Sequence, residues 1–270
     1  MKALCEAMGM TRQNYYKRRR RRQRRSVDEE LVVSLVRQER RVQPRLGGRK
    51  LLHVIEGELS EAGVRIGRDR FFELLGSHGL LLERAKRSVR TTDSRHGFRV
   101  YGNRVKDLEI ARPHQVLVSD VTYIRTEEGF VYLCLVMDAF SRAIVGYDCS
   151  DSLEREGALR ALGQALGQLA SGGGAIHHSD RGSQYCCQEY VEMLEASGVS
   201  ISMTEENHCY ENGQAERLNG ILKQEYGLGG TLGSKREALR GVEEAVELYN
   251  WRRPHQALGY AIPMEVHQAA

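Results

Sequence analysis

The sequence predicts an α/β protein in which a small all-α domain precedes a mixed five-stranded sheet flanked by helices. Apolar residues in the first third of the chain recur at helical spacing, whereas after Pro113 β-branched runs alternate with helical segments. The charge divides in the same way. Residues 1–112 carry 28 Lys and Arg against 14 Asp and Glu, and residues 113–270 carry 12 against 22. A basic front part suggests a polyanionic partner.

The composition is that of a globular protein, with 41% hydrophobic and 28% charged residues in a chain of 270. The first ten residues, MKALCEAMGM, lack the apolar stretch of a signal peptide. No window approaches the apolar run that a membrane span needs. We therefore expect a cytoplasmic protein without a membrane partner.

The cysteines favour neither a disulfide framework nor a zinc site. None forms a CxxC pair, and the ligand spacing of a Cys/His zinc module is missing. Small buried apolar residues are the better interpretation for most of them. The six are Cys5, Cys134, Cys149, Cys186, Cys187 and Cys209.

The basic N-terminal segment, 1–26, contains KRRRRRQRR at residues 17–25, with eight basic positions in nine. Such a block repels itself, so we expect it to stay extended until it meets phosphate. Contact with nucleic acid would then be driven by counterion release. A solvated linker is the plain alternative.

Residues 27–84 predict three short helices joined by glycine-containing turns. The expected helices are 27–42, which Pro44 ends, one within 45–59 that follows a Gly turn in the same stretch, and 67–78, which Gly79 closes. Three short helices with basic flanks suggest a helix-turn-helix-like DNA-binding domain, although small helical bundles are common. The polar and basic residues 85–112 predict a linker.

The remaining residues, 113–270, predict alternating strands and helices. Strands are expected at 116–124, 130–140, 143–150, 175–180 and 199–204, and helices at 153–170, 184–197, 211–226 and 234–252. The first three strands can form an antiparallel meander after a turn at 127–129, and helical crossovers bring in the others. This order is that of an RNase H-like domain.

Three carboxylates are candidates for a shared site. Asp120 interrupts an apolar strand, Asp180 follows the fourth strand, and Glu216 lies at the edge of the apolar face of a helix. Each has a plain alternative: a solvent-facing strand residue, a Ser-Asp-Arg-Gly turn, and an ordinary exposed helix glutamate. Acids that converge on one spot repel each other, so together they indicate a site for magnesium, which prefers oxygen ligands.

Five motifs occur in order and resemble the OrfB transposases of the IS-three insertion-sequence family, in the retroviral-integrase superfamily. They are SDVTYI (119–124), VMDAFSRAIVGY (136–147), HSDRGSQY (178–185), ENGQAERLNGILKQEY (211–226) and YNWRRPHQALGY (249–260). The 35 residues between Asp180 and Glu216 match the D-D-35-E spacing of that family. Glu211 departs from the Asp that many relatives have there, but it is not the catalytic acid.

The resemblance implies that Asp120, Asp180 and Glu216 are catalytic and bind Mg²⁺ or Mn²⁺, two ions per active site. It implies metal-dependent cleavage and strand transfer of insertion-sequence ends, with the terminal repeats and a target as double-stranded DNA partners. It also implies a homo-oligomer in the active complex, an OrfA partner or fusion, and a bacterial, nucleoid-associated protein. The retroviral HHCC zinc module is not visible, so no zinc is expected.

DNA contacts are expected from basic residues outside the triad. The candidates are Arg18, Arg19 and Arg20 with the rest of the basic block to Arg25, Arg49, Lys50, Arg68, Arg70, Lys223, Arg252, Arg253 and His255. Lys223 lies two turns after Glu216 and could reach a phosphate beside the site, or could be a solvated lysine. One of His177 and His178 could line the site, but adjacent strand residues point to opposite faces, so we expect at least one of them to be structural.

Two other functions remain open at this level. Another RNase H-like nuclease, such as a junction resolvase, would share the acids but would not need the basic front half or the motif series. A catalytically idle DNA-binding regulator would not need the acids.

Overall fold

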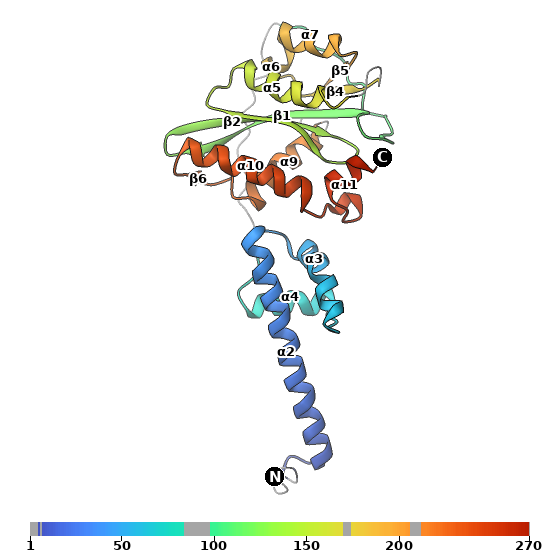
Figure 1. Ribbon diagram of the computed structural model, residues 1–270, viewed down its shortest axis with the longest axis vertical. Coiled ribbons are helices and arrows are strands. Elements are labelled where there is room, and N and C mark those ends of the chain that lie inside the picture. The colour runs from blue at the N-terminus through green and yellow to red at the C-terminus, as the bar shows by residue number, and fades with distance from the viewer. Residues whose placement is uncertain (1–4, 6, 84–97, 170–173, 206–211, 270) are drawn as a thin grey trace. The chain divides into compact units, whose positions relative to one another are not determined.

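The computed structural model describes residues 5, 7–83, 98–169, 174–205 and 212–269 (Figure 1). The chain divides into two compact units, Met1–Arg84 and Ala85–Ala270. Residues 85–97 of the expected linker, as well as Cys209 and Glu211, lie outside the described ranges. Within those ranges, no helix is both long enough and apolar enough to cross a membrane.

The first unit contains the three expected helices. They are α2 (Arg12–Val42), α3 (Gly48–Glu61) and α4 (Arg68–Ser77). One face of each helix is buried, with Val36 of α2, Ile55 of α3 and Phe71 of α4 at 1% exposure or less. The predicted helix ends are confirmed at Val42 and before Gly79, whose positive φ of 64° suits a residue without a side chain.

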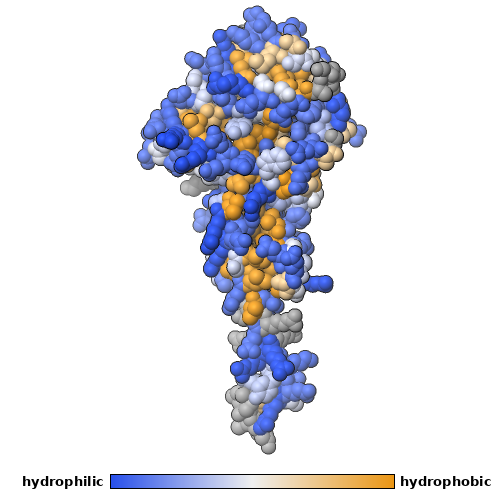
Figure 2. All heavy atoms as spheres, in the orientation of Figure 1, coloured by the Kyte–Doolittle hydropathy of each residue, from blue (hydrophilic) through white to orange (hydrophobic). Residues whose placement is uncertain are grey.

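The basic block is helical, so the expectation of an extended segment is wrong. Helix α2 begins at the N-cap Thr11, whose hydroxyl accepts a hydrogen bond from Asn14 N at 3.2 Å. Arginine favours helices, and a helix already packed further along its length extends by one hydrogen bond per residue. The expected boundary between residues 26 and 27 therefore falls inside a continuous helix. Figure 2 shows mostly hydrophilic side chains over its N-terminal part.

The second unit is built on the predicted mixed sheet. Its strands are β1 (Val116–Thr126), β2 (Gly129–Asp138), β3 (Ile144–Ser150), β4 (Ile176–Ser179), β5 (Ser200–Met203) and the two-residue β6 (Thr231–Leu232). The order is β3-β2-β1-β4-β5, and β6 pairs with the end of β1. Strands β1, β2 and β3 are antiparallel neighbours, whereas β4 and β5 join in parallel. The expected topology of five strands is thus confirmed, with β1 at the centre.

Helices cover both faces of this sheet (Figure 1). One face carries α5 (Arg155–Leu166), α6 (Ser183–Cys186) and α7 (Gln188–Ala196), and the other carries α9 (Gly213–Glu225) and α10 (Lys235–Trp251). The short η1 (Gln256–Leu258) and α11 (Pro263–Gln268) complete the chain. Successive β1 residues serve opposite cores: Leu117 packs with the α5 and α7 side, and Val116 and Val118 with the α9 and α10 side.

The structure departs from the prediction in two connections. The helix expected over 184–197 is broken at Cys187, whose extended backbone separates α6 from α7. Residues 98–112, expected as linker, pack on the second unit. Their apolar side chains, including Leu108 and Ile110, cover the core, and Arg104 N donates a hydrogen bond to Ser202 Oγ at 2.8 Å.

Two buried polar side chains hold the β2–β3 region in place. Asp138 accepts hydrogen bonds from Ser141 N at 2.7 Å and from His114 N at 2.6 Å. Asn250 of α10 bonds the backbone N and O of Ile144, both at 2.9 Å. Buried polar groups need such partners. These residues of the VMDAFSRAIVGY and YNWRRPHQALGY motifs therefore serve the fold.

We expect Gly146→Ala to destabilise the protein, because α5 packs directly on β3 at this glycine. An added Cβ would lie 2.1 Å from the carbonyl oxygen of Ala161, a backbone atom that cannot move alone. The free energy of unfolding, measured in urea, should fall by about 2–4 kcal/mol. Gly163→Ala, on the same helix with no atom within 4 Å of its added Cβ, should leave it equal or higher.

Candidate active site

Asp120 lies on the central strand β1, directly beyond the point where its neighbour β4 ends. Strand β4 pairs with β1 only as far as Ser119 opposite Ser179, so Asp120 is the first β1 residue beyond the end of β4. Two hydrogen bonds fix the half-buried carboxylate. Its Oδ1 accepts from Val121 N at 2.9 Å, and its Oδ2 accepts from Asn219 Nδ2 of α9 at 2.8 Å.

The charges of Asp180 and Glu216 both act on Asp120. Burial is the largest cause that raises the pKa of Asp120, and the charge on Asp180 is the next. The hydrogen bonds from Asn219 and Val121 lower it, Glu216 raises it further, and the pKa reaches about 7. Residues from a strand centre, a strand end and a helix thus share one electrostatic environment.

Asp180 and Glu216 reach this place through local structure. Asp180 follows β4, and its Oδ1 accepts a hydrogen bond from Gly182 N at 2.9 Å, so it serves the turn while also lining the cleft beside Asp120. Glu216 lies in the first turn of α9 and is exposed. The start of α9 is tied to β1 by buried Asn212, whose Nδ2 donates to Ser119 O at 3.0 Å.

The donor set suits a hard divalent cation, although its members stand apart. Carboxylate oxygens are the ligands that Mg²⁺ and Mn²⁺ favour. In the described part of the chain, no group of three His, Cys, Asp or Glu side chains is close enough to hold a metal ion as it stands.

A cleft of about 710 Å³ opens beside Asp120 and Asp180. Lys223 of α9 lines it, with its Nζ 5.1 Å from the centre of the Tyr123 ring. Burial lowers the pKa of Lys223, whereas the charge of Asp120 raises it. Of the two alternatives that the sequence left open for Lys223, the solvated lysine is therefore disfavoured, because the side chain lines the same cleft as Asp120 and Asp180.

The two histidines before Asp180 are both part of the core, so the expectation that one could line the site is wrong. His177 Nε2 lies 2.7 Å from Ser119 Oγ and 2.9 Å from Tyr190 OH, and His178 Nδ1 lies 2.9 Å from Ser202 Oγ. Burial, with a smaller effect of His178, lowers the pKa of His177 to about 3. A strand with helices on both faces buries both of its faces.

The basic candidates of the first unit differ in their exposure and partners. Exposed arginines lie along α2, at Arg18, Arg19 and Arg20, and α3 carries exposed Arg49 beside half-buried Lys50. On α4, Arg68 pairs with Asp69 at 2.8 Å, and Arg70 pairs with Glu29 and Glu73. The three α2 arginines and Arg49 present their charge to solvent, whereas Arg70 is held by two glutamates.

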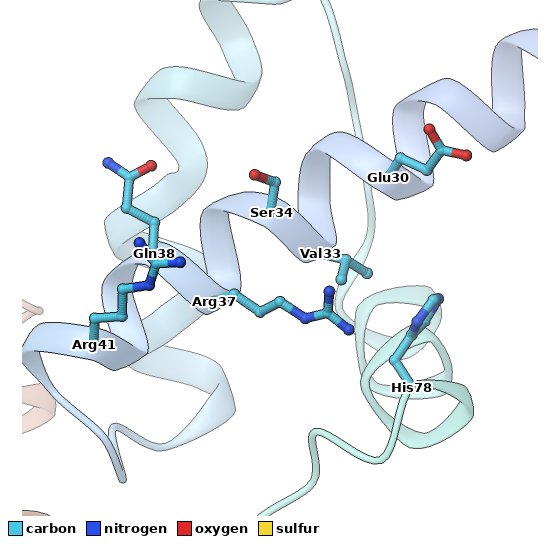
Figure 3. Close-up of a pocket in the computed structure, with 7 residues that line it drawn as sticks. All are labelled: Glu30, Val33, Ser34, Arg37, Gln38, Arg41 and His78. Carbon is cyan, nitrogen blue, oxygen red and sulfur yellow. The ribbon is translucent and has the colours of Figure 1, made fainter.

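Sequence reasoning missed a second basic surface in the first unit. A cleft of about 540 Å³ lies between α2 and the end of α4, and Figure 3 shows the side chain of Arg37 extending toward His78. Its lining residues are Glu30, Val33, Ser34, Arg37, Gln38, Arg41 and His78. The sequence could have indicated this surface, because Arg37 and Arg41 are four residues apart and therefore lie on one face of the helix.

The C-terminal cluster is mainly structural. Arg253 is 4% exposed, and its guanidinium binds both carboxylate oxygens of Glu225 at 2.8 and 3.1 Å. Half-buried His255 has its ring centre 6.4 Å from that of Tyr249, and Arg252 alone of the three is exposed. The expectation that Arg253 contacts DNA is therefore wrong, because its donors serve an ion pair within the fold.

We expect Arg253→Ala to lower stability, since it would leave the carboxylate of Glu225 without its guanidinium. The free energy of unfolding should fall by about 2–4 kcal/mol in a denaturant titration. Arg252→Ala should change it by less than about 0.5 kcal/mol. A stable Arg253→Ala protein with selectively weakened DNA binding would contradict this assignment.

Comparisons with known proteins agree with this architecture. Two integrase core domain families match the chain, one over residues 110–209 and the other over residues 197–263. An uncharacterized 31 kDa protein of insertion element IS600 from Shigella sonnei is 33% identical over 264 residues, which is 96% of each chain. The transposase InsF of insertion sequence IS3A from Escherichia coli K12 is 30% identical over 235 residues, covering 83% of this chain and 78% of that one.

Among solved structures, the cryo-electron microscopy structure of a simian T-cell lymphotropic virus intasome with PP2A regulatory subunit B56 gamma contains a similar chain. The TM-score is 0.50 at 16% identity, covering 82% of this chain and 74% of that chain. The likeness confirms the RNase H-like fold of the integrase core. By sequence and by fold, this chain belongs to the IS-three (IS3) family of insertion-sequence transposases, within the retroviral-integrase superfamily.

Proposed function

We propose that this chain is a DNA transposase that cuts the ends of an insertion sequence and joins them to target DNA. The observation that carries the proposal is the placement of Asp120 and Asp180 on one cleft, with Glu216 near enough that its charge, like that of Asp180, raises the pKa of Asp120. The relatives support the same function, since InsF is named a transposase and the matched families are integrase cores.

Asp120, Asp180 and Glu216 would hold Mg²⁺ or Mn²⁺, two ions per active site. When bound, such ions supply an activated water or 3′-hydroxyl and neutralise the charge on the leaving oxygen. Asp120 and Asp180 line the cleft, and the exposed Glu216 at the start of α9 would supply the third carboxylate.

Neighbouring residues would orient the acids and the DNA. Asn219 holds one oxygen of Asp120, and Gly182 N holds one oxygen of Asp180, so both carboxylates are restrained before substrate arrives. Lys223 lines the adjacent cleft and would contact a phosphate beside the scissile bond. No covalent protein–DNA intermediate is needed.

Double-stranded DNA, both terminal repeats and target, would be held largely outside the catalytic centre. The proposed contacts are Arg18, Arg19, Arg20, Arg49, Lys50, Arg68, Arg70, Arg252 and His255, joined by Arg37 and Arg41. Transposition acts on two element ends, so the active complex would contain at least two copies. An OrfA partner or fusion would add further DNA binding.

A strand-transfer assay tests the proposal. Purified full-length protein would be mixed with a labelled duplex carrying a terminal repeat of the element and with a plasmid target. Labelled plasmid should appear with Mg²⁺ or Mn²⁺ and not with EDTA. Cutting without joining would instead favour a resolvase-like nuclease, and DNA binding with neither reaction would favour a regulator.

A further inference from the structure

Aromatic side chains line part of the cleft beside Asp120 and Asp180, and the cutting and joining of phosphodiester bonds does not require them. Side chains alternate along a strand, so Tyr123 and Arg125 project from the same face of β1. Across the β1–β2 hairpin, Tyr123 pairs with Tyr132 and Arg125 pairs with Phe130. The four side chains therefore form one patch on one face of the sheet, and they line the same cleft as Asp120, which lies three positions before Tyr123 on the opposite face of β1.

This aromatic patch, defined by Tyr123, Phe130 and Tyr132, consists of one exposed ring and two half-buried ones. Phe130 is 39% exposed, and Leu153 at the rim of the cleft is 57% exposed. The rings of Tyr123 and Phe130 lie 5.5 Å apart at 80°. An exposed ring that continues two half-buried ones along a cleft suggests a flat apolar ligand.

Cations flank the same rings. The guanidinium carbon of Arg125 lies 5.4 Å from the centre of the Phe130 ring, and Lys223 Nζ lies 5.1 Å from that of Tyr123. A matching ligand combines a flat ring with negative charge, as a nucleotide does. The cleft volume of about 710 Å³ falls within the roughly 300–1,000 Å³ of small-ligand sites.

We propose that the aromatic patch binds an unpaired nucleobase of the DNA strand that passes the carboxylates. Single-stranded bases commonly stack on aromatic side chains of a sheet while cations hold the backbone. A base inside the duplex cannot reach such a surface, so the base must leave its pair. The inference rests on the proposed function for the identity of the strand, but the stacking can be measured without catalysis.

The test compares two probes bound by the full-length protein in EDTA. One is a ten-nucleotide oligo(dT), and the other is a ten-unit abasic oligomer with the same phosphates. The wild type should bind oligo(dT) roughly tenfold more tightly, because stacking adds to the shared phosphate contacts. The Tyr123→Ala/Phe130→Ala double variant should bind both probes equally.

Two controls keep the test specific. Trp251→Ala removes an aromatic side chain that is 52% exposed and does not line the cleft, so the preference for oligo(dT) should remain. Phe130→Trp keeps a stacking surface and should also retain it. Where the double variant does not fold, Phe130→Ala alone serves, since this ring is at the surface.

Photocrosslinking locates the base. Oligo(dT) carrying one 5-iodouracil should crosslink to Tyr123, Phe130 or Tyr132. Crosslinks confined to Tyr15 and Tyr16 of α2, or a base preference that survives the double substitution, would overturn the inference. Strand transfer without base preference rejects only this inference, whereas base preference without strand transfer rejects only the proposed function.

Discussion

Asp120→Asn, Asp180→Asn and Glu216→Gln should each reduce magnesium-dependent strand cleavage by about a thousandfold or more. Each change keeps the size of the side chain but removes a charge, and several kcal/mol of transition-state stabilisation would be lost with it. Cleavage of a labelled terminal-repeat duplex, followed on a denaturing gel, measures the rate.

The same variants should bind DNA within about threefold of wild type, because most phosphate contacts lie elsewhere. Glu205→Gln is a matched control, since this glutamate precedes α9 in the sequence and accepts a hydrogen bond from Asn103 N instead. Full activity in any one of the three triad variants would remove that residue from the proposed site.

Asp120→Asn should also stabilise the metal-free protein at neutral and alkaline pH. The folded-state pKa of Asp120, about 7, lies above the unfolded value near 3.8. The folded state therefore binds the proton of Asp120 more tightly than the unfolded state does. The stability that this proton contributes is fully present below about pH 4 and is lost as pH rises through 7. Removing the charge should add about 2–4 kcal/mol above pH 7 and little at pH 4.

Thermal unfolding in EDTA across this pH range measures the difference between variant and wild type. Glu216→Gln is the control, because its exposed side chain should give a much smaller gain. Added Mg²⁺ should stabilise the wild type and not the Asp120→Asn protein. If the stability of variant and wild type changed equally with pH, the raised pKa of Asp120 would be contradicted.

Much of the fold could be predicted because local patterns agree with the tertiary structure. The β-branched run around Asp120 becomes β1, and glycines such as Gly79 and Gly198 end helices with positive φ. Part of the candidate site could also be predicted from the sequence. Asp120 is a charged residue in an otherwise apolar strand, and such a local conflict indicates function. To predict that Asp120 and Asp180 lie on the same cleft, one also had to predict that β1 and β4 are neighbours in the sheet.

What could not be predicted depends on long-range partners. Nothing local shows that Arg253 finds Glu225 on another helix, or that Leu108 in an irregular segment packs on the core. The helical state of the arginine block depends on the packed half of α2, outside the block itself. The two-residue β6 is too short for any periodicity to reveal it.

The uninterrupted α2 makes the spacing between its contacts a fixed length. At about 1.5 Å per residue, Arg19 sits roughly 20 Å along the axis from the buried Val32. A flexible segment could contact a duplex anywhere within its reach, whereas a continuous helix holds its contacts at a fixed distance. Phosphates bound by the N-terminal part of α2 and phosphates bound by α3 would therefore be separated by a constant fraction of a DNA turn. Residues inserted into α2 would change that separation.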